Sequence, residues 1–296
     1  MPSKITIAAA QILTRYDIDE NLIKIEKAID EAARRGCRIV AFHEGCLSGY
    51  RTSPDVLEQL DLERLGRAEA EVVALAGQKK ISVLMGSVSC VEGRYYNDVL
   101  IVDESGTVLG RYAKTWRAGE QWFEPGAGPV IFTVSGIEAT TIVCHDLRYP
   151  ELTRLAAAAG ARIVFIVNNE SGLSQPEKLL GYRSMQIARG TENMIYSMMI
   201  NSPCDPDYTT EPCASHGNSL IADPLGNVMD EAGWYEERLV VAEIDPQHAT
   251  RATALRTLGK GPGRTSTGRG DLENAPYTRW MREGVKMVRR LEGGIR

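Results

Sequence analysis

One segment constrains the fold of this chain more than any other, the stretch Ala139–Glu151. Its first part, Ala139–Val143, is apolar except for two threonines and predicts a buried strand. The strand ends at Cys144, and the following Asp146 and Pro150 are typical of the start of a helix. Backbone N–H groups at such a turn lower the pKa of a thiol and can donate to an oxyanion. Cys144 can equally be a small buried hydrophobe, as most free cysteines are.

Strands and helices alternate along the whole chain. In the predicted helix Asn21–Arg35, apolar residues fall on one face and charged residues on the other, and Gly36 ends it. Buried strands, helices and interspersed hairpins predict an α/β protein whose mixed sheet or sheets are covered by helices, folded as a single domain over residues 1–296. We expect strands at 5–12, 38–42, 81–89, 95–103, 107–112, 130–134, 139–143, 162–168, 194–201, 217–222, 227–230 and 239–244, and further helices within 54–80 and at 150–159, 179–192, 245–258 and 277–291.

Composition restricts the partners of the chain. A formal net charge of −5 and the lack of a dense basic run argue against nucleic acid or an anionic membrane. No stretch approaches the roughly 20 apolar residues of a membrane-spanning helix. The six scattered cysteines favour free thiols in a reducing cytoplasm, and the spacing of Cys204, Cys213 and His216 fits no standard zinc site. We therefore expect a cytoplasmic protein without a metal or other cofactor.

Reactive groups follow two apolar strands and a hairpin. Glu44 comes just after the strand 38–42, Lys114 follows the hairpin 95–112, and Cys144 follows the strand 139–143. A carboxylate at such a place is costly to bury unless it is paired or functional. Taken alone, Glu44 is as well explained by a helix cap or a salt bridge, and Lys114 by a solvated surface position.

The motifs around these residues resemble the nitrilase-like carbon–nitrogen hydrolases. The segment Cys144–Glu151 is similar to the C-x-D-x-R-F/Y-P-E signature of that family, and the resemblance extends in the family's order from about Lys4 to Asp245. Phe123 stands one place earlier than in the family's pattern. The other matching segments are Phe42–Tyr50, Tyr96–Asn97 with Gly110–Lys114, Gly119–Gly126, Ala188–Asn193 with Asn201, and His216–Ser219 with Asp223–Gly226.

The resemblance implies a four-layer α-β-β-α sandwich with mixed sheets and a Glu-Lys-Cys catalytic group. Cys144 would be the nucleophile and Glu44 the general base and acid. Lys114 and the backbone N–H of His145 would stabilise the oxyanion of the tetrahedral intermediate, and Glu120 would match an additional glutamate that orients the site. These residue types fit the chemistry, because a thiol attacks an amide poorly unless a base takes its proton.

The expected reaction is hydrolysis of a non-peptide C–N bond in a small aliphatic amide. It would pass through a thioester, use water as second substrate and release ammonia or an amine. Asp146 favours amides over nitriles, because the nitrile-cleaving branch resembles C-W-E at this place. Hydrolysis of N-carbamoyl amino acids or amines is an alternative, as is acyl transfer to an amine or alcohol. An alternative from another class is a catalytically silent binding or scaffold protein.

Substrate choice and assembly are less constrained by the sequence. The candidates for the substrate pocket are Tyr50, Trp116, Trp122, Asn169 and Glu170. The resemblance also implies a homodimer or a higher homo-oligomer, in which the C-terminal tail, residues 259–296, is exchanged across the interface.

Overall fold

The fold is known from a computed structural model, which describes residues 4–51, 53–170, 176–205, 215–259 and 275–293. The helices are α1 Ile18–Arg34, α2 Pro54–Glu58, α3 Leu62–Lys79, α4 Pro150–Ala159, α5 Pro176–Thr191, α6 Ala252–Thr257, α8 Pro276–Lys286 and the 3-10 helix η1 Cys144–Arg148. The strands are β1 Ile5–Gln11, β2 Cys37–Phe42, β3 Ser82–Val91, β4 Arg94–Val102, β5 Val108–Ala113, β6 Val130–Val134, β7 Ile137–Val143, β8 Ile163–Val167, β9 Tyr196–Ile200, β10 Leu220–Ala222, β11 Val228–Glu231, β12 Arg238–Ile244 and β13 Arg289–Leu291.

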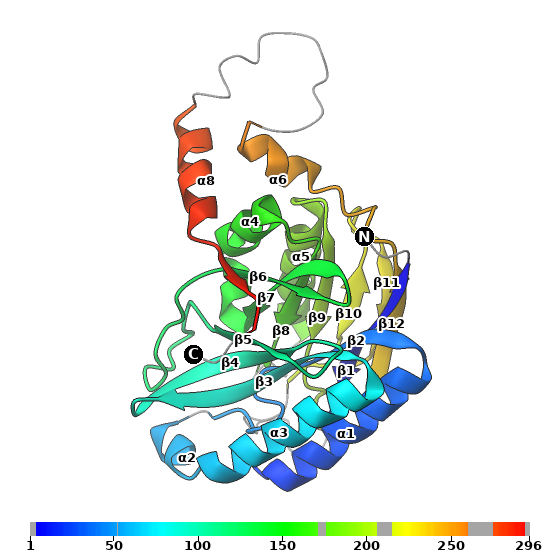
Figure 1. Cartoon of the computed structure of the whole chain (residues 1–296), viewed down its shortest axis with the longest axis vertical. Coiled ribbons are helices and arrows are strands. Elements are labelled where there is room, and N and C mark those ends of the chain that lie inside the picture. The colour runs from blue at the N-terminus through cyan, green and yellow to red at the C-terminus, as the bar shows by residue number, and fades with distance from the viewer. Residues whose placement is uncertain (1–3, 52, 171–175, 206–214, 260–274, 294–296) are drawn as a thin grey trace.

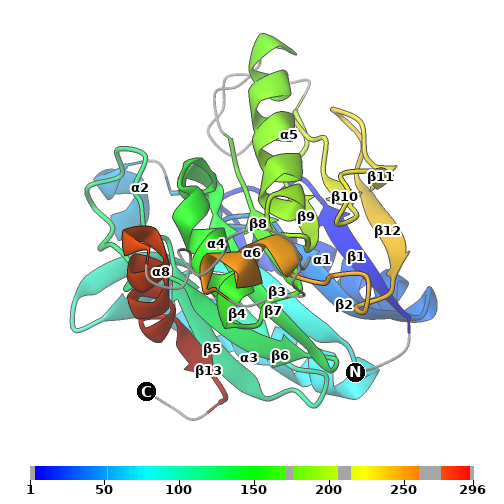
Figure 2. The ribbon, with the colours of Figure 1, turned by 90° about the horizontal axis from the view of Figure 1, so that it is seen from above.

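These strands form two mixed sheets. The first sheet has the order β12-β1-β2-β3-β4-β5 and the second the order β11-β10-β9-β8-β7-β6-β13. Helices α1 and α3 lie along the outer face of the first sheet, and α4 and α5 lie against the second (Figure 1). Figure 2 shows α4, α5, α6 and α8 on the same side of the second sheet. The α-β-β-α sandwich predicted from the family resemblance is therefore confirmed.

Three apolar layers hold the sandwich together. The central layer lies between the sheets and joins residues such as Ile39 and Val99 of the first sheet to Phe132 and Phe165 of the second. The outer layers lie between each sheet and its helices. Strands β2 and β8 are buried almost throughout because both of their faces are covered.

Local signals in the sequence explain where the main helices begin. The side chain of Asp17 accepts hydrogen bonds from the backbone N–H groups of Asp19 and Glu20 at the start of α1. Pro150 occupies the first turn of α4, where its missing N–H leaves no helical hydrogen bond unmade. Among the described residues, no helix has the length and apolar character needed to cross a bilayer.

The prediction was wrong in two places near the C-terminus. The helix expected at 245–258 is only α6, because Asp245 holds a turn in which its side chain accepts from the N–H of Gln247. The final helix, expected at 277–291, ends at Lys286, and Arg289–Leu291 instead pairs in parallel with β6. The described part of the tail thus packs on its own chain, with Met281 fully buried.

Candidate active site

Cys144 stands at the junction between β7 and the 3-10 helix η1. Its φ of 46° lies in the left-handed region, which is uncommon for a residue other than glycine. Its side chain is buried, with 7% of the residue exposed, and it lines a pocket. The strand therefore presents the thiol at its carboxyl end in a fixed and strained conformation.

Asp146 joins this turn to the segment that carries Lys114. Its buried carboxylate accepts from the hydroxyl of Tyr112 at 2.7 Å and from the backbone N–H of Trp116 at 2.7 Å. It also accepts from the N–H groups of Thr115 at 3.3 Å and Val143 at 3.2 Å. One side chain thus fixes the residues after β5 against the end of β7.

Glu44 lies two residues beyond β2 and is fully buried. Its Oε1 accepts from Asn97 Nδ2 at 2.7 Å and from Lys114 Nζ at 3.1 Å, and its Oε2 accepts from the backbone N–H of Asn169 at 3.0 Å. Burial raises the pKa of the Glu44 carboxyl above its usual value, although Lys114 opposes this shift.

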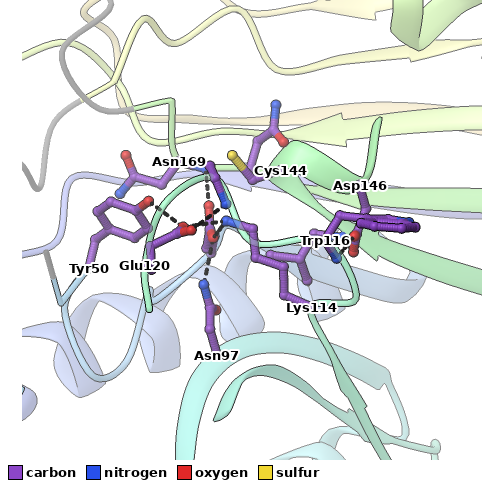
Figure 3. A network of polar contacts seen from close by, with 12 residues as sticks. Tyr50, Asn97, Lys114, Trp116, Glu120, Cys144, Asp146 and Asn169 are labelled. Atoms are coloured by element: carbon purple, nitrogen blue, oxygen red, sulfur yellow. Dashed lines mark hydrogen bonds and ion pairs between the residues drawn. The ribbon is translucent and has the colours of Figure 1, made fainter. Parts of the chain in front are cut away.

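The ammonium group of Lys114 lies between two carboxylates. Besides Glu44, it donates to Glu120 Oε1 at 2.6 Å, and Figure 3 shows the chain of contacts that results. Glu120 is fixed further by the Tyr50 hydroxyl at 3.3 Å and by the backbone N–H of Ala118. Burial opposes the charge on Lys114, but the carboxylates outweigh it and hold its pKa well above the usual range. The same ion pair lowers the pKa of Glu120 against the effect of burial.

The thiol of Cys144 is not activated as its position in the sequence predicts. Burial raises its pKa well above the usual value, and the carboxyl groups of Glu44 and Glu170 raise it further. Desolvation and nearby negative charge thus outweigh any lowering of this pKa by the helix N–H groups. This shift favours the protonated thiol, so a base is needed for its attack.

Two glycines allow the backbone to pack closely behind the glutamate and lysine segments. A Cβ at Gly86 would lie 2.2 Å from the carbonyl oxygen of His43, and one at Gly126 would lie 2.0 Å from that of Ala113. Because backbone atoms cannot yield to such contacts, any other residue would displace the segments that position the carboxylate and the ammonium group.

A pocket of about 360 Å³ opens beside the thiol. Its volume is that of a site for a small molecule. The residues that line it are Tyr50, Ala118, Gly119, Glu120, Trp122, Cys144, His145, Asn169, Glu170 and Tyr182. Four of the five pocket candidates from the sequence are thus at the pocket.

Trp116, the fifth candidate, is placed elsewhere. Its ring stacks on Tyr149 with the centroids 4.5 Å apart, and 47% of the residue is exposed. Because Asp146 binds its backbone N–H, the segment passes the pocket with this side chain turned to the outside. Trp116 contributes to the site through its backbone.

Sequence reasoning gave no role to Asn97 and Tyr182. The order of the first sheet explains why Asn97 contacts Glu44, because β4, which carries Asn97, lies next to β3. Nothing in the sequence distinguishes Tyr182 from other residues of α5. As for a metal site, the described residues contain no cluster of three or more His, Cys, Asp or Glu able to hold one, and Cys213 lies outside them.

Comparisons with known proteins agree with this geometry. The family model of the carbon-nitrogen hydrolases matches residues 6–254. An (R)-stereoselective amidase from Pseudomonas sp. is 28% identical over 216 residues, which cover 72% of this chain and 76% of that protein. The 2-oxoglutaramate amidase of Bacillus subtilis is 28% identical over 252 residues, or 83% of this chain and 93% of that one.

A solved structure is similar over most of the chain. A mutant amidase from Nesterenkonia sp. AN1 has a TM-score of 0.74 and 25% identity, and the match covers 86% of this chain and 93% of that one. In that structure the active-site cysteine carries the acetamide moiety of fluoroacetamide. The chain belongs to the carbon-nitrogen hydrolase family. The relatives named here are amidases, and in the solved structure the residue that carries the adduct is a cysteine.

Proposed function

We propose that this enzyme hydrolyses a small aliphatic amide through an acyl thioester on Cys144. One observation carries the assignment: the thiol lines a pocket beside a buried cluster in which Lys114 bridges Glu44 and Glu120. That cluster supplies a base, an acid and a cationic donor within one site. The match to an amidase that is alkylated at its active-site cysteine supports the same residue type as nucleophile.

In the first step, Sγ of Cys144 attacks the amide carbonyl carbon while Glu44 takes the thiol proton. Because the pKa values of the thiol and of the carboxyl are both raised, proton transfer accompanies attack and no stored thiolate is required. The carbonyl π electrons move to oxygen. An ammonium group has three N–H donors, of which Lys114 gives two to carboxylates. Its third and the backbone N–H of His145 would bind the oxyanion.

In the second step, the C–N bond breaks and Glu44 returns its proton to the departing nitrogen. Ammonia or an amine then leaves and the acyl group stays on sulfur. Glu44 next takes a proton from water, which attacks the thioester carbonyl. Breakage of the C–S bond releases the acid, and the thiolate recovers the proton from Glu44. Glu120 keeps Lys114 in place throughout by its ion pair.

The substrate is proposed as a linear amide rather than a nitrile. The related proteins include two amidases whose names state an amide as substrate class. The pocket volume of about 360 Å³ suits a compound of this size, and an N-carbamoyl group presents the same carbonyl and leaving nitrogen. Carbamoyl compounds are therefore the alternative substrates to test.

An ammonia-release screen tests the proposal. Short aliphatic amides, N-carbamoyl compounds and nitriles are offered to the wild type and to Cys144→Ala. We expect release from at least one amide and its complete loss in this variant. Cys90→Ala, at a half-buried cysteine in β3 outside the pocket, is the matched control and should retain activity. Unchanged ammonia release in Cys144→Ala would overturn the assignment.

We also propose that residues 1–296 form one domain and that the protein is a cytoplasmic homodimer or higher homo-oligomer. Residues 259–296 would contribute to contacts between the subunits. Support comes from three large side chains, Tyr277, Trp280 and Met287, that are 49–65% exposed in or just after α8. The ring centroids of Tyr277 and Trp280 lie 5.7 Å apart, and exposed apolar side chains that lie together are typical of an interface. Light scattering on the purified full chain tests the assembly.

A further inference from the structure

Glu170 is a second carboxyl group beside the nucleophile, and the mechanism above does not use it. Strands β7 and β8 run parallel with Val143 opposite Val167, so the residues that follow them meet at one edge of the sheet. Glu170 is 6% exposed and lines the pocket. The Sγ of Cys144 donates to its Oε1 at 3.8 Å, which places this carboxyl against the reacting atoms.

The contacts of Glu170 hold its side chain but do not neutralise it. Asn168 Nδ2 donates to its Oε1 at 3.3 Å, and the hydroxyl of Tyr182 also hydrogen-bonds its carboxyl. Within the described ranges Glu170 forms no ion pair. Lys114 is occupied by its two carboxylates, and the exposed Arg148 donates to Tyr182 at 3.0 Å.

A buried carboxyl at a pocket wall is costly unless a cation reaches it. We propose, building on the function proposed above, that Glu170 binds an ammonium group on the carbon next to the amide carbonyl, so that the substrates are α-amino amides. Bond lengths and angles place such a nitrogen about 2.5 Å from the carbonyl carbon. When Cys144 attacks that carbon, the ammonium lies within hydrogen-bond reach of an oxygen 3.8 Å from the sulfur.

The titration of Glu170 agrees with this role. Its pKa is raised to about 7, chiefly by burial and also by Glu44, while Tyr182, Lys114 and Arg148 oppose the shift. An α-amino group has a pKa of about 7.7–8.0 in reference peptides. Near neutral pH the ammonium of the substrate would thus meet a carboxyl that ionises readily in its presence. The groups that face Glu170 are Cys144 and Arg148 from η1, Tyr182 from α5, Asn168, Ser215, Glu44 and Lys114.

Two amides of nearly the same shape test the inference. Alaninamide and isobutyramide differ mainly in that an ammonium group replaces a methyl group. We expect the wild type to favour alaninamide in kcat/KM on the order of 10- to 100-fold at pH 7.5, as a charge-assisted hydrogen bond supplies. In Glu170→Gln this ratio should fall to about one, mainly through a higher KM for alaninamide. Glu151→Gln, at an exposed carboxyl in the first turn of α4, should keep the wild-type ratio.

The outcomes separate this inference from the proposed function. An unchanged ratio of the two kcat/KM values in Glu170→Gln overturns the inference. If both values also fall by the same factor, Glu170 acts in the chemical steps instead. No preference for alaninamide in the wild type, or no hydrolysis of alaninamide, also overturns it. Failure of the proposed function is seen separately, as ammonia release from any amide that persists in Cys144→Ala.

Discussion

Glu44 shows how a single buried carboxyl can be both fixed in place and basic. Its two oxygens accept from Asn97, Lys114 and the backbone of Asn169, while burial raises its pKa. Glu44→Gln keeps the shape and one acceptor oxygen but cannot take a proton. We expect kcat for the best amide of the screen to fall by roughly 10²- to 10⁴-fold, measured by ammonia release.

The control for this variant is Glu69→Gln. Glu69 is also ion-paired, to Arg111, but lies on α3 away from the pocket. Its substitution should leave kcat within about threefold of the wild type, a range typical of contacts remote from the chemistry. A similar loss in both variants, or a loss below tenfold in Glu44→Gln, would contradict the role of Glu44 as base.

Glu170 makes stability depend on pH. Its pKa rises from 4.5 to about 7 on folding, so the folded state binds this proton more tightly than the unfolded state. The contribution of protonated Glu170 to the free energy of unfolding is therefore fully present below pH 4.5. It is lost as the pH rises through about 7. The loss amounts to about 3 kcal/mol. Relative to the wild type, Glu170→Gln should gain that amount at pH 8 and nothing at pH 4.5.

Urea unfolding at the two pH values measures this difference. Glu151→Gln serves as the control for the substitution itself. If the difference between Glu170→Gln and the wild type were the same at both pH values, the raised pKa would be refuted. This experiment needs no substrate, so it examines the carboxyl independently of its proposed ligand.

At the scale of elements, Asp146 couples the end of β7 to the segment after β5. In Asp146→Ala, the backbone N–H groups of Thr115, Trp116 and Val143 lose this acceptor, and the Tyr112 hydroxyl keeps only its contact with Thr115. Each buried donor left unpaired costs about 1–3 kcal/mol. We expect a loss of roughly 3 kcal/mol or more in the free energy of unfolding and a fall in kcat of at least tenfold, since Lys114 precedes these residues directly.

Asp103→Ala is the matched control for this element. The Asp103 side chain accepts from the N–H groups of Ser105 and Thr107 in the turn between β4 and β5, away from the pocket. Its loss should lower stability and leave kcat unchanged. Urea unfolding and ammonia release on both variants distinguish a turn that only stabilises from one that also positions Lys114. Equal kcat in the two variants would refute the coupling.

Most elements could be predicted because they carry local signals. The strand 139–143 and the helix 150–159 correspond to β7 and α4, since an apolar run, Pro150 and Gly160 mark them. The raised pKa of Cys144 could not be predicted locally, because it depends on burial in the fold and on Glu44 and Glu170, which other strands bring close. The contact between Cys144 and Glu170 depends likewise on the register of two strands, which no local pattern specifies.

At the scale of the whole molecule, the sandwich itself was predicted only through the family resemblance. The alternation of strands and helices indicates covered sheets but does not assign each strand to one of two sheets. The wrong prediction for Arg289–Leu291 has a similar cause. This short strand joins the edge of the second sheet beside β6, about 160 residues earlier in the chain, and two of its three residues are arginines. Its pairing comes from tertiary contacts, which a short segment does not reveal.

Substitutions in and just after helix α8 show how the end of the chain contributes to the free energy of unfolding. Met281 is fully buried among residues of the outer apolar layer that includes Leu155 of α4, whereas Met287, just after the helix, is 65% exposed. Met281→Ala should lower the free energy of unfolding by about 2–5 kcal/mol, because it removes buried methylene groups and leaves a cavity. Met287→Ala should change it by less than about 0.5 kcal/mol. Urea unfolding of the full chain measures both, and equal effects would mean that α8 does not pack as described.

Because a subunit contact would make stability depend on concentration, a midpoint for Met281→Ala that shifts with dilution would indicate that the tail also contacts a second copy.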